Sequence, residues 1–450
     1  MSPDPIGPDE TRRIADAALG LEGVDGVEVL FIHEWGGLTR FAGSVIHQST
    51  SREDTGLRIR VVSEGRIGVA ATNDFSEEGA VTAAQSAKEM AEVVAPDPLF
   101  PGLAPPADPG RKDSFDHSTA ALTPAERAEG VASLVAQAGN GFHAAGSYET
   151  TAVEVAVANT EGQFCYGAST QAAVTALVSG GEDGAGYVEA WSTRSPELDH
   201  EAIGRRAARK ALDSQRPRDM DPGRYEVVLE PAAVATLVAF LSYMGFGGRA
   251  LIEGRSCLSG KEGQQVAAEQ VSIADDALAQ GSPGFAFDFE GTPKRRVDII
   301  REGVFRTGVY DRRSAKQAGT ESTGHALPPP NPQGPFPLNL MMEPGAASTD
   351  QLLRSVDRGL LVTRFHYSNI VHPTQSVITG MTRDGTWLVE DGEIKHPVKN
   401  FRFTQSILEA LKGVELVSKD TEMVSEFFFS ASRVPAVKMS SFNFTGKSDH

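Results

Sequence analysis

Apolar and polar residues alternate along four stretches near the start of the chain, at residues 27–34, 38–48, 56–63 and 68–72. A period of two is typical of strands that bury one face, and Glu64-Gly65 is placed to turn the last pair. Residues 9–19 and the alanine-rich residues 75–94 have helical spacing instead. The pattern therefore predicts an antiparallel strand meander covered by helices.

Six prolines interrupt residues 95–110, which predicts a surface connection, because proline is excluded from helix interiors and central strands. A second set of elements follows, with helices at 124–137 and 201–212 and strands at 150–158, 163–166, 171–179 and 187–192. A polar, proline-bearing stretch at 213–223 then favours a domain boundary. We predict an N-terminal α+β domain over residues 1–220.

The second half of the chain is richer in strand and turn signals. Residues 225–230 predict a strand, and Pro231 can begin a helix over 231–244 that is apolar all round and expected to be buried. Turn dipeptides occur at Glu302-Gly303, Asp384-Gly385 and Asp391-Gly392, and the proline-rich residues 325–337 predict a loop. We predict a β-rich C-terminal domain over residues 221–450, so the fold class is α+β.

Charge and composition restrict the partners of the chain. Its 450 residues carry 42 Lys+Arg and 60 Asp+Glu, a net charge of −18, without a dense basic run. Binding to nucleic acid is therefore not expected. The first ten residues lack the basic and apolar regions of a signal peptide, and the longest apolar run, 232–241, is too short to span a bilayer. With only two cysteines as well, we expect a cytoplasmic protein with no membrane partner.

Glycines gather between Gly245 and Gly263, and residues 245–250 fit the loose dinucleotide-binding pattern G-x-G-x-x-A. That fingerprint follows a strand and opens a helix, whereas here the glycines follow a predicted helix, so we reject it. A Walker loop is excluded because Glu262 stands where Ser or Thr should follow Lys261. The preferred interpretation is a glycine-lined loop that allows close backbone approach.

The other titratable residues give no clear catalytic site. His366 and His372 would stand about 20 Å apart on the extended chain that Pro373 demands, too far to share a metal, so we expect substrate-facing or hydrogen-bonding roles. Buried, unreactive thiols are preferred for Cys165 and Cys257 over a nucleophile. The carboxylates of residues 275, 276, 288 and 290 offer oxygen ligands for a hard cation, but we expect solvated loop carboxylates.

Five blocks in order resemble the TldD/TldE (PmbA) family. They are GRSCLSGKEGQ at 254–264, VSIADD at 271–276, DFEGTP at 288–293, STGH at 322–325 and TGMTRDGTWLVEDGEIKHPV at 379–398. The helix, meander and second helix at the start of the chain are also similar to that family's opening α+β domain. The resemblance thus spans nearly the whole chain and implies the TldD/PmbA fold for both predicted domains.

The resemblance implies two kinds of subunit, which together form a peptidase. A TldD-type chain carries His-Glu-x-x-x-His on a helix and a later cysteine as metal ligands, and a TldE-type chain lacks them. In this sequence the matching helix is 231–244, and no histidine occurs between Glu201 and Gly324. The region from Phe428 to Ser432 offers hydroxyls in place of the cysteine. The resemblance therefore implies a TldE-like subunit with no catalytic residue and no metal ligand of its own.

The resemblance further implies a hetero-oligomeric metallopeptidase, in which a TldD-like paralogue carrying HExxxH holds zinc or iron and this chain contributes peptide binding and assembly. The residues expected to bind substrate are Arg364, His366, Tyr367, His372 and Arg383. The loop expected near the partner's active site contains Gly247, Gly248, Gly254, Ser256, Cys257 and Gly260. Two alternatives stay open: a stand-alone non-metal hydrolase or tailoring enzyme of a natural-product pathway, and a homodimeric peptide-binding protein.

Overall fold

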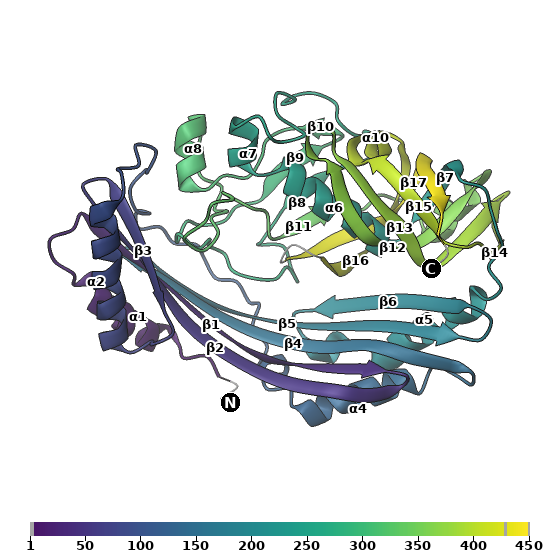
Figure 1. Ribbon diagram of the computed structural model, residues 1–450, viewed down its shortest axis with the longest axis horizontal. Helices are drawn as coiled ribbons and strands as arrows, with labels where there is room; N and C mark the ends of the chain where they lie inside the picture. The colour runs from purple at the N-terminus through teal and green to yellow at the C-terminus, as the bar shows by residue number, and fades with distance from the viewer. Residues whose placement is uncertain (1–3, 427–429, 449–450) are drawn as a thin grey trace.

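Two β-sheets organise the chain, and the computed structural model describes residues 4–426 and 430–448. The first sheet has six antiparallel strands in the order β3-β2-β1-β4-β5-β6. These are β1 (Gly26–Ala42), β2 (Val45–Ser63), β3 (Arg66–Thr72), β4 (Phe142–Asn159), β5 (Phe164–Gly180) and β6 (Gly184–Ser192). They form the long curved sheet along one side of the molecule (Figure 1).

The strands of this sheet are longer than the alternation predicts. The alternation of apolar and polar residues breaks at Gly36 and Gly37, yet strand β1 continues through both. Glycine is required at these positions because neighbouring atoms occupy the space of a side chain. A side-chain carbon at Gly36 would lie 2.1 Å from the Thr150 carbonyl oxygen, and one at Gly37 would lie 2.2 Å from the guanidinium of Arg127. The polar residues 49–55 also belong to a strand, since β2 pairs with β1 along this stretch while its side chains face solvent.

Helices cover the first sheet as predicted. They are α1 (Pro8–Leu19), α2 (Glu77–Val93), α3 (His117–Ala120), α4 (Pro124–Val135) and α5 (His200–Asp213), with a 3-10 turn η1 (Ser195–Glu197). One face of α2 is a row of buried alanines that packs on β2 and β3. A side-chain carbon at Gly68 would lie 1.8 Å from the Ala87 carbonyl oxygen, so the helix backbone rests directly on the strand.

The second sheet has eleven strands among the described residues. Its main path is β10-β9-β8-β11-β17-β15-β13-β12-β7, with β14 beside β13 and β16 beside β17. The strands are β7 (Gly223–Leu229), β8 (Ile273–Asp275), β9 (Val297–Arg301), β10 (Val304–Phe305), β11 (Leu340–Met342), β12 (Arg358–His372), β13 (Val377–Glu390), β14 (Glu393–Pro397), β15 (Phe401–Ser406), β16 (Val414–Glu426) and β17 (Ser430–Lys447). This half is β-rich, as predicted; the two-domain division at residue 220 stays a prediction.

One long helix lies inside the C-terminal half. Helix α6 (Pro231–Gly245) packs against β12, β16 and β17, and 13 of its 15 residues are buried. Its buried position confirms the prediction from its apolar composition. The shorter helices are α7 (Gly248–Ile252), α8 (Arg312–Ala318), α9 (Thr349–Arg354) and α10 (Ile407–Lys412), with a 3-10 turn η2 (Pro373–Gln375). Within the described residues, no helix is long and apolar enough to cross a membrane.

Most of the predicted turns are present. Glu64-Gly65, Glu302-Gly303 and Asp391-Gly392 each join two antiparallel strands, with both residues of each pair at positive φ. The turn predicted at Asp384-Gly385 is wrong, because both residues lie inside β13. Their φ values of 56° and 126° accompany a register shift against β12, which directs the Asp384 side chain toward Arg364.

Apolar and charged contacts join the two halves. Phe287, from a loop of the C-terminal half, packs with Leu30, Val155 and Val157 of the first sheet. Beside this cluster, one Nη of Arg60 lies 3.2 Å from a carboxylate oxygen of Glu28 and 3.2 Å from one of Glu290. A buried charge cluster therefore lies where the C-terminal half meets the first sheet.

Candidate functional site

Helix α6 is the place where the family resemblance predicts the site, so its side chains decide whether this chain can hold a metal. Between Pro231 and Gly245 the helix has no His, Cys, Asp or Glu. Two of its hydroxyl groups bond within the helix: Thr236 donates to the Ala232 carbonyl and Ser242 to that of Ala239. A hydrolytic zinc site needs imidazole, thiolate or carboxylate ligands. The side chains of α6 do not fit such an ion.

The rest of the described structure offers no other metal site. No group of three or more His, Cys, Asp or Glu side chains among residues 4–426 and 430–448 is placed to hold a metal. The predicted hydroxyl-bearing region from Phe428 to Ser432 lies partly outside the described residues. Within it, Ser432 is fully buried.

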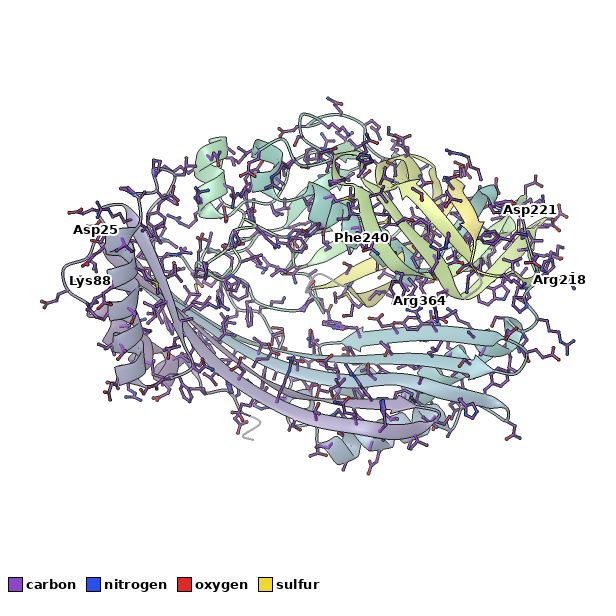
Figure 2. All side chains as sticks on the ribbon, viewed as in Figure 1. Asp25, Lys88, Arg218, Asp221, Phe240 and Arg364 are labelled. Carbon is purple, nitrogen blue, oxygen red and sulfur yellow. The ribbon has the colours of Figure 1, made fainter. Side chains whose placement is uncertain are left out.

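A charged cluster lies between the C-terminal sheet and strand β6 (Figure 2). Arg364 of β12 donates through Nε to a carboxylate oxygen of Asp384, 2.7 Å away, and its Nη2 donates to the same oxygen. The guanidinium also lies 4.0 Å from the ring centre of Tyr187 in β6, a cation–π contact across the two halves. Arg364 is therefore held by an acid on one side and an aromatic ring on the other.

Three more predicted residues lie at this cluster. Arg383 pairs with Arg364 across the two strands, and its Nε is 3.9 Å from Asp384. His366 is half-buried, and burial lowers its pKa, as do the positive charges of Arg364 and Arg383. Its ring meets that of Tyr367 edge to face, with 4.8 Å between the centres. Tyr367 is 72% exposed, at a bulge of β12 with φ 50°.

His372 does not join them. It is exposed at the far end of β12, six residues beyond His366, which is about 20 Å along an extended strand. Its backbone is extended, as Pro373 requires. The structure thus brings together four of the five predicted substrate-binding residues.

Strand β6 supplies a residue that sequence reasoning missed. Glu189 accepts hydrogen bonds from the Tyr187 hydroxyl at 3.0 Å and from the backbone N–H of Ser425 in β16 at 2.6 Å. Burial raises the pKa of Glu189 to about 7, against the lowering effect of these bonds and of Arg364. The only sequence signal was the alternation that puts Tyr187 and Glu189 on one face of a strand.

The glycine-rich loop has different neighbours. A side-chain carbon at Gly248 would lie 2.4 Å from the Tyr310 ring, and Gly247 forms a β-bridge with Val309. Gly254 and Gly260 adopt positive φ in turns that open to solvent. The Ser256 hydroxyl donates to the Gly245 carbonyl and accepts from the Leu258 N–H, which fixes the loop after α6.

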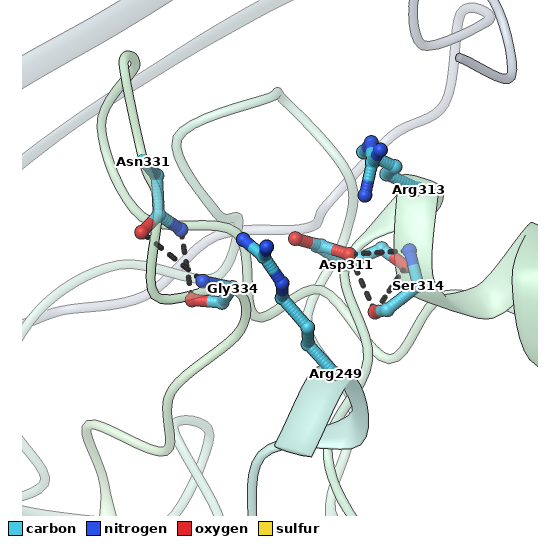
Figure 3. A pocket seen from close by; sticks show the side chains of 6 residues that line it. All are labelled: Arg249, Asp311, Arg313, Ser314, Asn331 and Gly334. Carbon is cyan, nitrogen blue, oxygen red and sulfur yellow. Dashed lines mark hydrogen bonds between the residues drawn. The ribbon is translucent and has the colours of Figure 1, made fainter. Parts of the chain in front are cut away.

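A small cavity adjoins this loop. It has a volume of about 140 Å³ and is lined by Arg249, Asp311, Arg313, Ser314, Asn331 and Gly334 (Figure 3). Arg249 donates to Glu253, and Arg313 donates to Asp97 from the proline-rich connection. Since both arginines already have acid partners, the cavity is not a strong site for an anion.

Two acids that we expected to be solvated are buried, so that prediction is wrong for Asp275 and Asp288. Asp288 accepts from the N–H groups of Glu290, Thr292 and Ala326, and burial raises its pKa to about 7. Asp275 bonds to His325 at 2.9 Å, and this partner lowers its pKa although burial acts in the opposite direction. Backbone N–H groups and a histidine distant in sequence supply the hydrogen bonds of these two acids. No local sequence pattern indicates such partners.

Both thiols are expected to be unreactive in the folded chain. Cys165 and Cys257 are 2% exposed, and burial raises their pKa values to about 12 and about 11. Because the thiolate is the reacting form, an alkylating reagent at neutral pH should add to neither cysteine in native protein and to both in denaturant. Intact mass measures the adducts. An adduct at Cys257 in folded protein would show that the glycine-rich loop opens, and it would support a nucleophilic role for this thiol.

Comparisons with known proteins agree along most of the chain. Residues 27–91, 109–215 and 222–446 match the models of PmbA/TldA metallopeptidase domain 1, central domain and C-terminal domain. The chain belongs to the PmbA/TldD family.

Individual relatives support this assignment. A metalloprotease of Methanothermobacter thermautotrophicus is 27% identical over 395 residues, covering 83% of this chain and 84% of that protein. Metalloprotease PmbA of Escherichia coli O157:H7 is 25% identical over 399 residues, with 86% of each chain covered. The crystal structure of TldE from Thermococcus kodakarensis superposes with a TM-score of 0.87 at 22% identity, covering 97% of this chain and 99% of that one, so the fold is the same.

Proposed function

We propose that this chain is the metal-free, TldE/PmbA-like subunit of a cytoplasmic, heteromeric metallopeptidase that acts on peptides. A TldD-like paralogue carrying HExxxH supplies the zinc or iron and activates the water. The observation that carries the proposal is the chemistry of α6, whose buried side chains offer no ligand where the family resemblance places the metal site. The chain's own contribution is to position the substrate.

The Arg364 cluster supports that positioning role. Arg383 is partly exposed beside His366 and Tyr367, so a cation, an imidazole and an aromatic hydroxyl border one stretch of β12 and β13. Such groups suit the carbonyls, side chains and terminal carboxylate of a peptide. Arg364 itself is engaged by Asp384 and Tyr187 and orients the cluster.

The proposal is tested by producing the chain with and without an HExxxH paralogue from the same genome. We expect a stable complex, peptide cleavage by the complex alone, loss of cleavage with a chelator, and zinc or iron at one equivalent per pair. Cleavage by the isolated chain in excess chelator would show the stand-alone hydrolase instead. A homodimer that binds peptide and ignores the paralogue would show the binding protein.

Arg383→Ala in the assembled complex is expected to lower kcat/KM for peptide by about tenfold, because one charge-assisted contact to the substrate is lost. Arg358→Ala is the matched control, since Arg358 lies at the other end of the same strand pair, exposed and paired with Glu390. The control should cleave like the parent. Equal kinetics for both variants, with the complex intact, would remove Arg383 from the substrate site.

A further inference from the structure

A lysine side chain is buried in the C-terminal half, and no acid among the described residues forms an ion pair with it. Lys294 is 8% exposed, and within the described residues its Nζ makes one hydrogen bond, to Oδ1 of Asn339 at 3.2 Å, and no ion pair. Lysine is rarely buried unless it is paired. Burial lowers the pKa of Lys294, although the charges of Asp275 and Asp288 oppose this. Burial therefore raises the share of the neutral, nucleophilic amine above that of an exposed lysine.

The amide that Lys294 meets is held on every side. Asn339 is 3% exposed, and its Nδ2 donates to the Pro283 carbonyl at 2.7 Å. Its backbone N–H donates to Asp275 at 2.7 Å, and Asp275 is fixed in turn by His325. These bonds assign the amide oxygen to the side of Lys294 and the amide nitrogen to the side of Pro283. The amine and the amide group are thus held at hydrogen-bond distance in a fixed orientation.

We propose that Lys294 and Asn339 are joined by an intramolecular isopeptide bond. The lone pair of Lys294 Nζ attacks Cγ of Asn339, a Cγ–Nζ bond forms, and the Cγ–Nδ2 bond breaks. One proton passes from Nζ to Nδ2, which leaves as ammonia. The exchange of one amide for another requires neither an oxidant nor a reductant, and atoms balance with ammonia as the sole by-product.

A second lysine shares an acceptor with the amide nitrogen that leaves. Nζ of Lys112 donates to the Pro283 carbonyl at 2.7 Å, and Nδ2 of Asn339 donates to the same oxygen at 2.7 Å. Burial lowers the pKa of Lys112 to about 7. Lys112 is a positioning residue in this scheme, since it acts through the shared carbonyl.

The bond would close a loop of the C-terminal half beside its junction with the N-terminal half. It joins the segments before β9 and β11, and Lys112 and Ser114 of the N-terminal half dock on the loop at Pro283 and Gly284 nearby. A covalent link that closes this loop restricts the unfolded chain as a disulfide does, but reducing agents do not break it.

The proposal is tested by measuring the intact mass of the purified full chain. The protein is first kept for several days at the growth temperature of its source organism. We expect a mass about 17 Da below that of the sequence, the loss of one ammonia, and a branched tryptic peptide containing both Lys294 and Asn339. The full sequence mass, with the two peptides separate, would overturn the proposal.

Succinimide formation at an asparagine also releases ammonia, so substitutions must separate the two reactions. Lys294→Arg should keep the full mass, because a guanidinium does not attack the amide, whereas Lys316→Arg, an exposed control, should lose ammonia like the parent. Asn339→Asp should lose water instead, about 18 Da, and give the same branched peptide. Ammonia loss in Lys294→Arg, or an uncrosslinked Asn339→Asp chain, would contradict the bond. If Lys294→Arg fails to fold, the water loss of Asn339→Asp and the branched peptide of the parent chain test the bond instead.

Discussion

Asp384→Asn is expected to lower the free energy of unfolding by about 2 to 4 kcal/mol, because it leaves the Arg364 guanidinium poorly compensated in a buried place. The Asp384 side chain is 5% exposed and that of Arg364 is 19% exposed. Asparagine keeps the shape of aspartate and tolerates its positive φ of 56°, so the lost charge is the main change. Urea unfolding at neutral pH measures the effect.

The same strand pair provides the control. Arg358 and Glu390 also face each other across β12 and β13, at 2.9 Å, but their side chains are 61% and 37% exposed. Glu390→Gln should therefore cost less than about 1 kcal/mol. Replacing Arg364 by methionine in the Asp384→Asn chain removes the uncompensated charge and keeps asparagine at the positive φ of position 384, so it should restore most of the stability that Asp384→Asn loses. If Asp384→Asn and Glu390→Gln lowered the free energy of unfolding equally, water would be compensating the charge of Arg364, and the cluster would not be buried.

The fold was largely predictable because its signals are local. Alternation in β1 to β6, Pro231 at the start of α6 and dipeptides such as Glu64-Gly65 each act within a few residues. Strand length was underestimated where the cause is distant. Gly36 and Gly37 break the alternation, yet β1 continues because the backbone of Thr150 and the side chain of Arg127 occupy the space that side chains would need.

The candidate site was predictable only in part, for the same reason. The cluster of polar residues near Arg364 is visible in one short segment, so Arg364, His366 and Arg383 could be singled out. Their partners Tyr187 and Glu189 come from the other half of the chain, and pairing across the halves depends on how the two sheets meet. Asp384 was interpreted as a turn residue, because Asp-Gly signals a turn in the absence of the Arg364 contact.

Glu28→Gln is expected to stabilise the chain, and more so at high pH. Glu28 is 1% exposed, and within the described residues neither carboxylate oxygen has a hydrogen-bond partner, although Arg60 is 3.2 Å away. Burial raises the pKa of Glu28 from 4.5 to about 7, outweighing the attraction of Arg60. The folded chain therefore holds this proton more tightly than the unfolded chain does. The stability due to Glu28 is full below pH 4.5 and is lost as the pH rises toward 7.

Glutamine resembles the protonated acid, so the free energy of unfolding of Glu28→Gln should exceed that of the parent by about 1 kcal/mol at pH 5 and about 3 kcal/mol at pH 8. Glu34→Gln on the same strand is the control: Glu34 is a partly exposed partner of Arg52, and its replacement should change stability by less than about 1 kcal/mol at either pH. Urea titrations at the two pH values give both differences. A Glu28→Gln chain less stable than the parent at pH 8 would mean that the Arg60 ion pair outweighs the cost of burying the carboxylate. In that case Glu28 would balance the charge of Arg60 within the first sheet and Glu290 would balance it across the junction, so neutralising Glu290 would loosen the junction.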